Sequence, residues 1–151
     1  MTQDLKARAA LAQELQALLH DYWHDVDANW GRNAGTYYTD DADFVGEAAT
    51  YSGRAKIQAF YSWRVAQGPR LAVHAVNNFR VESLEADRAR ATWYLLLYAA
   101  NGEPVLPTHP PITISLVTDD YVRGADGEWL CARRAFKTLF QGGAPAHNPK
   151  L

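Results

Sequence analysis

The sequence predicts an α+β domain in which N-terminal helices close an internal pocket within a cone-shaped, curved antiparallel sheet. Apolar residues recur at helical spacing in the first half of the chain, whereas the second half consists of long runs rich in β-branched and aromatic residues. Helices placed at one end of an antiparallel sheet are typical of the α+β class. The length of 151 residues is usual for one domain, so we expect residues 1–151 to form a single unit with a core over about 10–140.

The first predicted helix covers about residues 3–33. Gly31 and Gly35 are expected to end it. Its apolar positions recur every three or four residues, as on one face of a helix. They are Leu11, Leu15, Leu18, Leu19, Tyr22, Trp23, Val26 and Trp30.

A short helical turn over residues 36–43 is expected next, leading into an edge strand around 44–46. Residues 51–54 form a turn, and a second helix follows over about 55–67. Gly68 and the proline after it close this helix. One side of the helix carries Ile57, Phe60, Tyr61, Arg64 and Val65.

The remainder of the chain predicts three or four long antiparallel strands. Prolines between residues 104 and 111 make an irregular connection, because proline cannot donate a hydrogen bond within a central strand. Residues 124–127 form a hairpin turn, and 142–151, which contain Gly, Pro and Asn, are expected to be a loose arm. The extended runs cover residues 71–84, 88–100, 112–123 and 128–140.

Composition and charge exclude several classes of partner. The formal net charge is −2 and there is no run of Lys or Arg, so a nucleic-acid partner is not expected. No segment approaches about 20 apolar residues, and residues 1–6 lack a signal-peptide pattern; a cytoplasmic protein without a membrane span is therefore predicted. The single cysteine, Cys131, lies in an apolar stretch and is expected to be a buried, inert thiol.

Two residues could form a carboxylate–imidazole dyad. Asp27 lies at the margin of the apolar arc of the first helix, where a partly desolvated carboxylate needs a partner. His74 lies within an apolar strand, where its imidazole needs a hydrogen-bond partner. In such a dyad the carboxylate fixes the tautomer and the imidazole accepts a proton. A solvated helix-end Asp27 and a structural His74 are the alternatives.

Four segments together resemble the SnoaL-like, nuclear transport factor 2-like superfamily. They are the helical segment 22–30, residues 38–42, the turn into the second helix at 51–57 and the hairpin 121–129. The resemblance covers about residues 10–140 and implies the fold more firmly than the reaction, since this fold hosts many chemistries.

The site pattern is most similar to those of scytalone dehydratase and hexachlorocyclohexane dehydrochlorinase. Those enzymes use an Asp–His dyad whose positions match Asp27 and His74. The chain departs from the dehydratase pattern at Val26, where that enzyme has a tyrosine. It also has Tyr98 near the position of a second catalytic histidine. The resemblance therefore implies Tyr98 as a further catalytic hydrogen-bond donor.

Several other side chains are candidates for binding a substrate or for protonating a leaving group. Tyr22 could protonate a leaving oxygen, His109 could cap the pocket mouth, and either Arg133 or Arg134 could reach the pocket or form a surface salt bridge. Core or interface roles are the alternative for the aromatic candidates. The candidate substrate-binding residues are Tyr22, Trp23, Tyr38, Trp63, Trp93, His109 and Phe136.

No metal or cofactor is predicted. His20, His24 and Asp27 have metal-ligand spacing on a helix, but both histidines fall away from the apolar arc and no further ligand completes a shell. The sequence also lacks a glycine-rich phosphate loop, so no nucleotide is implied.

The resulting hypothesis is a cofactor-independent lyase acting on a small hydrophobic, aromatic or polycyclic substrate. Dehydration, loss of halide and release of formaldehyde are the eliminations considered. An isomerase or cyclase with the same dyad, and a non-catalytic small-molecule-binding module, are the alternatives; the small subunit of an aromatic-ring dioxygenase ranks below them. The resemblance implies a homodimer or homotrimer.

Overall fold

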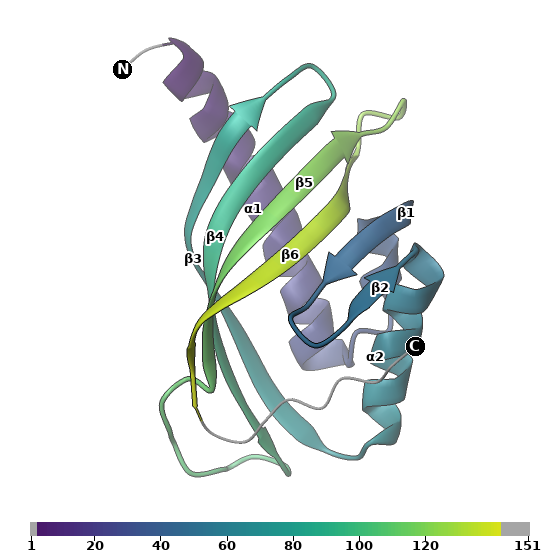
Figure 1. Ribbon diagram of the computed structural model, residues 1–151, viewed down its shortest axis with the longest axis vertical. Helices are drawn as coiled ribbons and strands as arrows, with labels where there is room; N and C mark the ends of the chain where they lie inside the picture. The colour runs from purple at the N-terminus through teal and green to yellow at the C-terminus, as the bar shows by residue number, and fades with distance from the viewer. Residues whose placement is uncertain (1–2, 143–151) are drawn as a thin grey trace.

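The computed structural model describes residues 3–142 and has two α-helices and one six-stranded sheet (Figure 1). The helical elements and the short strands come first. They are α1 (Gln3–Asn29), the 3₁₀ helix η1 (Ala34–Tyr37), β1 (Tyr38–Val45), β2 (Thr50–Ser52) and α2 (Arg54–Ala66). Four long strands follow, namely β3 (Arg70–Leu84), β4 (Arg88–Asn101), β5 (Thr113–Arg123) and β6 (Trp129–Gln141).

The sheet is curved and open, with the strand order β2-β1-β6-β5-β4-β3. The long strands cross one side of α1, while α2 lies next to β1 and β2 (Figure 1). Irregular pairing between β3 and β4 at Asn77/Arg80 and Val81/Ser83 breaks the ladder. Such bulges bend a strand and increase its twist, which helps the sheet to wrap around the helix. The predicted α+β class, with helices closing one side of a curved sheet, is thus confirmed.

Three local predictions need correction. The first helix ends at Asn29, because Trp30 and Gly31 both have positive φ angles and turn the chain away. At Gly31 a Cβ atom would lie 2.6 Å from Cδ1 of Tyr61, so this close approach to α2 requires glycine. The first strand begins at Tyr38 rather than 44, and the turn region at 51–54 contains β2.

The sheet also departs from the purely antiparallel expectation at one pair. β1 runs parallel to β6, with Phe44 paired to Arg134, while the other neighbouring pairs are antiparallel. A parallel neighbour requires a long connection, and the whole chain from β2 to β5 supplies it.

A charged pair lies within the core between α1 and the sheet. Arg134 and Asp119 are 2% and 0% exposed. Their side chains form a bidentate pair, with Nε–Oδ1 at 2.8 Å and Nη2–Oδ2 at 2.9 Å. Trp93 and Tyr121 donate to the same carboxylate. The guanidinium and the carboxylate of this pair therefore find their hydrogen-bond partners within the protein.

The remaining fold predictions divide between those confirmed and those lying outside the described residues. The four long strands lie within two residues of their predicted bounds, and Cys131 is buried as expected. Burial raises the pKa of this thiol, so it stays protonated and inert. The predicted loose arm, apart from Gly142, lies outside residues 3–142. No helix within the described part of the chain is long and apolar enough to cross a membrane.

Candidate active site

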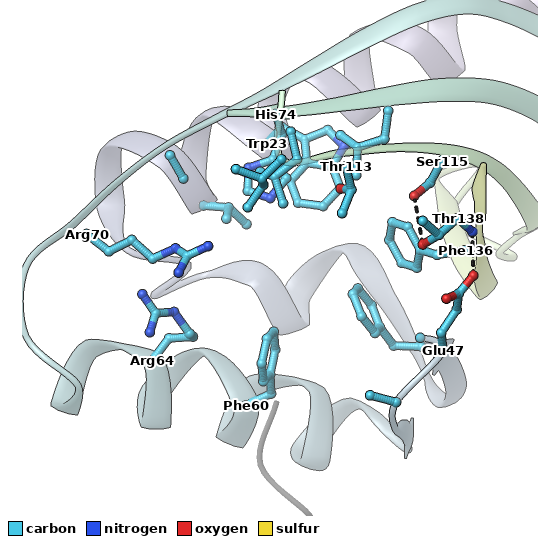
Figure 2. Close-up of a pocket in the computed structure, with 18 of the residues that line it drawn as sticks. Trp23, Glu47, Phe60, Arg64, Arg70, His74, Thr113, Ser115, Phe136 and Thr138 are labelled. Atoms are coloured by element: carbon cyan, nitrogen blue, oxygen red, sulfur yellow. Dashed lines mark hydrogen bonds between the residues drawn. The ribbon is translucent and has the colours of Figure 1, made fainter. Parts of the chain in front are cut away.

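A pocket with a volume of about 360 Å³ lies between the concave side of the sheet and the two helices. Its size is within the range of small-molecule sites. Apolar and aromatic side chains form much of the wall, with a few polar groups among them (Figure 2). The aromatic wall residues are Trp23, Trp30, Phe44, Phe60, Tyr61 and Phe136.

Asp27 and His74 meet at this pocket, with His74 in the wall and Asp27 behind it. Nδ1 of His74 lies 2.6 Å from Oδ1 of Asp27. The backbone N–H of His74 donates to Oδ2 of the same carboxylate at 2.9 Å. Both carboxylate oxygens are thus engaged by one residue, which fixes the position of Asp27 relative to the ring. Because an ionised carboxylate only accepts hydrogen bonds, Nδ1 carries the ring proton and Nε2 keeps a lone pair.

Trp23 fixes the orientation of the imidazole. Its indole stacks on the His74 ring with centroids 4.0 Å apart and planes at 7°. The side chains of His74 and Asp27 are only 13% and 22% exposed. A stacked indole would also stabilise a protonated imidazole through its π face. The ring is therefore held from two directions while Nε2 has no protein partner among the described residues.

Two aspartates near the end of α1 have different tasks. Asp25 is buried and accepts hydrogen bonds from the Asn29 side chain, the Asn33 side chain and the Asn33 backbone, so it ties down the turn after the helix. Asp27 lies about 200° further around the helix and faces β3 instead. This offset separates the structural carboxylate from the one that contacts the pocket histidine.

The structure places two of the predicted substrate-binding residues in the pocket wall. Trp23 contributes the face next to His74, and Phe136 on β6 lies on the far side of the pocket (Figure 2). Phe136 lies beside Phe44, with ring centroids 5.0 Å apart. An aromatic substrate could pack between these two walls.

Tyr98 is not brought to the dyad. It pairs with Val73 on β3, one residue out of phase with His74, which pairs with Leu97. Neighbouring residues on a strand point to opposite faces, so Tyr98 lies on the outer, exposed face of the sheet. The predicted catalytic role of Tyr98 therefore does not fit the structure.

Five further candidates lie outside the pocket wall. Tyr22, Tyr38 and Trp93 are buried in the core around the Asp119–Arg134 pair. Trp63 packs on Phe60 from α2 without reaching the wall, and the Nδ1 atom of His109 contacts the carbonyl of Pro110 in the proline-rich connection.

Arg134 is also neither a pocket residue nor part of a surface salt bridge, and Arg133 is exposed. Large aromatic side chains suit a core and a pocket wall equally well, so residue type alone does not show which of them line the pocket.

His20 and His24 lie on the exposed side of α1. Within residues 3–142 no three His, Cys, Asp or Glu side chains converge in a way that could hold a metal ion.

Most residues of the pocket wall were missed as site candidates, including one tyrosine and two arginines. Tyr61, Arg64 and Arg70 line the wall, the first two from α2 and the third from the start of β3. Burial raises the pKa of the Tyr61 hydroxyl, which is bonded to the hydroxyl of Tyr22. The signal that could have found two of them is helical spacing, since Phe60, Tyr61 and Arg64 share one face of α2.

A sequence model of the SnoaL-like domain matches residues 7–135. The chain belongs to the SnoaL-like family. This family includes polyketide cyclases and dehydratases. A comparison of this SnoaL-like chain with curated protein sequences finds no match.

Solved structures with the same fold are similar over nearly their whole length. ActVI-ORFA from Streptomyces coelicolor is 21% identical with a TM-score of 0.72, covering 86% of this chain and 98% of that one. A protein from Catenulispora acidiphila in complex with S-DNPA is 24% identical with a TM-score of 0.70, covering 87% and 95%. An NTF2-like protein with a cystatin-like fold from Novosphingobium aromaticivorans is 22% identical with a TM-score of 0.68, covering 92% and 90%. At these identities the likeness establishes the NTF2-like fold of the SnoaL-like chain.

Proposed function

We propose that this protein is a cofactor-independent lyase acting on a small hydrophobic, aromatic or polycyclic substrate. The observation that carries the proposal is the Asp27–His74 pair at the wall of the pocket, with Nδ1 at 2.6 Å from the carboxylate. A histidine whose Nδ1 proton is held by a carboxylate presents its Nε2 lone pair as a general base. Dehydration is the leading reaction, with loss of halide or release of formaldehyde as related eliminations.

In the proposed reaction, Nε2 of His74 removes a proton from a carbon atom of the substrate. The electrons of the broken C–H bond form a double bond to the neighbouring carbon, and the C–O bond to a hydroxyl on that carbon breaks. Asp27 and the Trp23 indole stabilise the imidazolium that forms. In a release of formaldehyde, the proton instead leaves a hydroxymethyl oxygen, whose electrons form the C=O bond while the C–C bond breaks, and the carbon left with that electron pair takes the proton back from the imidazolium.

The leaving oxygen needs a proton, and His74 is the group best placed to supply it. Tyr22 is 1% exposed with its hydroxyl turned to Tyr61, and Tyr98 lies on the opposite face of the sheet. The imidazolium formed by the first step can return its proton to the departing hydroxide, which leaves as water and restores the base. One residue can thus perform both proton transfers on the same face of the substrate.

The test is proton NMR of a panel of hydroxylated aromatic and steroidal compounds incubated with wild type, Asp27→Asn and His74→Ala. We expect elimination by wild type and a loss of at least about 10²-fold in both variants. His24→Ala, on the exposed side of the same helix, is the matched control and should retain full activity. Elimination that survives both dyad changes would contradict the proposal.

An isomerase or cyclase is the second candidate, because the same base serves both reactions and the SnoaL-like family includes cyclases. Running the panel in D₂O separates the two. Deuterium incorporation or rearrangement without loss of a leaving group would favour the isomerase or cyclase. A protein that binds the compounds without either change would be a small-molecule-binding module.

We further propose that copies of this chain associate through the outer face of the sheet as a homodimer or homotrimer. This face exposes the large apolar side chains Leu71, Val73, Tyr94 and Tyr98 on the neighbouring strands β3 and β4. Contiguous apolar surface of this kind is typical of an interface. Light scattering coupled to size-exclusion chromatography should give two or three times the 16.8 kDa chain mass, and Val73→Lys should lower it.

A further inference from the structure

Two arginines lie at one end of the pocket. Arg64 comes from the last turn of α2 and Arg70 from the first residue of β3, and both line the wall. Figure 2 shows their guanidinium groups reaching toward one another, with Glu47, Ser115 and Thr138 at the opposite end. The pocket therefore has a cationic end and a neutral-to-acidic end.

Neither arginine has a protein partner among residues 3–142. The other arginines in or around the fold that are partly or fully buried do have partners, as Arg54 has with Asp40 and Arg134 with Asp119. The acidic residue in the pocket wall, Glu47, is engaged by the backbone N–H of Thr138 at 2.6 Å and lies at the far end. Two half-buried guanidinium groups thus face an apolar pocket, and no carboxylate of the described residues pairs with their ten N–H donors.

Two like charges side by side in a partly desolvated site repel one another. Burial lowers the pKa of both guanidinium groups, and for Arg64 the positive charge of Arg70 lowers it further. Both still carry their charge at neutral pH, since the ordinary value is above 12. A pair of like charges in a partly desolvated site is stabilised when an anion binds between them.

We propose that Arg64 and Arg70 bind a carboxylate group of the substrate, which is therefore an aromatic or otherwise apolar acid. A planar carboxylate matches the fork of a guanidinium, and the apolar walls hold the rest of the molecule. This inference deepens the proposed function, because it names the substrate class of the same pocket. No catalytic step depends on the arginines.

Arg70 of the carboxylate site and His74 lie on the same strand. Arg70, Ala72 and His74 alternate along the strand and share the pocket face. Four residues of strand span about 13 Å between the Cα atoms of Arg70 and His74. The acid group and the proton removed by His74 therefore belong to different parts of the substrate, so the carboxylate does not itself activate the C–H bond.

The experiment is isothermal titration calorimetry with biphenyl-4-carboxylate and its uncharged isostere, biphenyl-4-carboxamide. Wild type should bind the acid at least about tenfold more tightly than the amide, because only the acid makes charge-assisted hydrogen bonds. Arg64→Gln and Arg70→Gln should each remove most of this preference. Arg80→Gln is the matched control, since Arg80 lies on the same strand but pairs with Glu82 outside the pocket.

A second measurement needs no ligand. If the arginines serve a bound anion rather than the fold, Arg70→Gln should melt at or above the temperature of wild type. Equal binding of acid and amide, including no binding of either, would overturn the proposal, and so would a preference that both glutamine variants retain. A clear fall in melting temperature for Arg70→Gln would also count against it.

The same titration with Asp27→Asn separates this inference from the lyase proposal. The variant should keep the preference for the acid, because Asp27 lies behind His74 and not at the cationic end. If the acid preference holds while no compound is turned over by wild type, the lyase proposal fails and the carboxylate site stands. If wild type turns over a compound but shows no preference for the acid, the carboxylate site fails and the lyase proposal stands.

Discussion

The core and the pocket of this protein treat charged side chains in opposite ways. In the core, Arg134 and Asp119 are almost fully buried, and each donor and acceptor between them is used by the other or by Trp93, Tyr121 and Tyr38. In the pocket, His74 is engaged on one ring nitrogen only, and Arg64 and Arg70 have no partner within the described chain. The comparison teaches that hydrogen bonding within the protein, and not burial alone, separates groups that hold the fold from groups that are candidates to bind a ligand.

The largest effect should come from breaking the core pair. Arg134→Met leaves the Asp119 carboxylate buried without its counter-charge, which typically costs about 3–5 kcal/mol. That is a large share of the stability of a domain of this size. Urea unfolding should report the loss, with Arg133→Met, the exposed neighbour on the same strand, unchanged within about 0.5 kcal/mol. Similar stability of the two variants would show that the core pair is not structural.

Replacing the pocket carboxylate of Asp27 should lower activity strongly and leave stability nearly unchanged. In Asp27→Asn the amide oxygen can keep the backbone hydrogen bond from His74, which turns the amide NH₂ toward Nδ1. The ring must then place its proton on Nε2 and loses its basic lone pair there, as expected from tautomer control in catalytic triads. We expect kcat to fall about 10²–10³-fold with less than about 1 kcal/mol of stability lost. Steady-state kinetics and urea unfolding of the same preparation provide the check.

Alkaline pH should weaken the fold through four buried tyrosines. Burial is the first cause that raises the pKa values of Tyr22, Tyr38, Tyr61 and Tyr121 well above their ordinary value. The folded protein then keeps protons that the unfolded chain releases above about pH 10, so this stability is complete below pH 10 and declines as the pH rises further. Absorbance at 295 nm should show these phenols ionising only together with unfolding followed by circular dichroism. Ionisation of all tyrosines in a folded protein would contradict this.

The smallest effect should come from the outer face of the sheet. Tyr98→Phe removes the hydroxyl that the family resemblance linked to catalysis, yet Tyr98 faces away from His74. We expect kcat/KM to stay within about twofold of wild type. A loss approaching that of Asp27→Asn would mean that the outer face takes part in the reaction.

The elements were largely predictable because their signals are local. The second helix begins and ends within one residue of its predicted bounds, since Gly53 and Gly68 flank it and apolar residues recur along one side. The end of α1 was harder to predict. The helical spacing of apolar residues continues to Trp30, but the helix ends at Asn29, and the turn that follows is held by hydrogen bonds to the Asp25 carboxylate. The parallel pairing of β1 with β6 is a long-range event that no local pattern encodes.

The site was predictable where one residue could be judged by its own element. Asp27 and His74 could be proposed from a helix margin and an apolar strand, and they lie in contact. Tyr98 could not be judged this way, because the register between β3 and β4 decides its face and a shift of one residue reverses it. Arg70 directly follows a glycine–proline pair that indicates a helix end, so its place in the pocket depends on the tertiary fold alone.

Because Arg70, Ala72 and His74 alternate on one face of β3, the position of the arginine along this edge strand relates to the length of the proposed substrate. The Cα atoms of Arg70 and His74 are two strand repeats apart, so an exchange along the strand moves the Arg70 half of the proposed anion site in steps of about 7 Å. An Ala72→Arg/Arg70→Ala variant would bring the arginine one strand repeat closer to His74 while leaving the dyad in place. Exchanges on a single strand are thus a route to shorter or longer acids in proteins with this fold, with the Asp27–His74 pair kept unchanged.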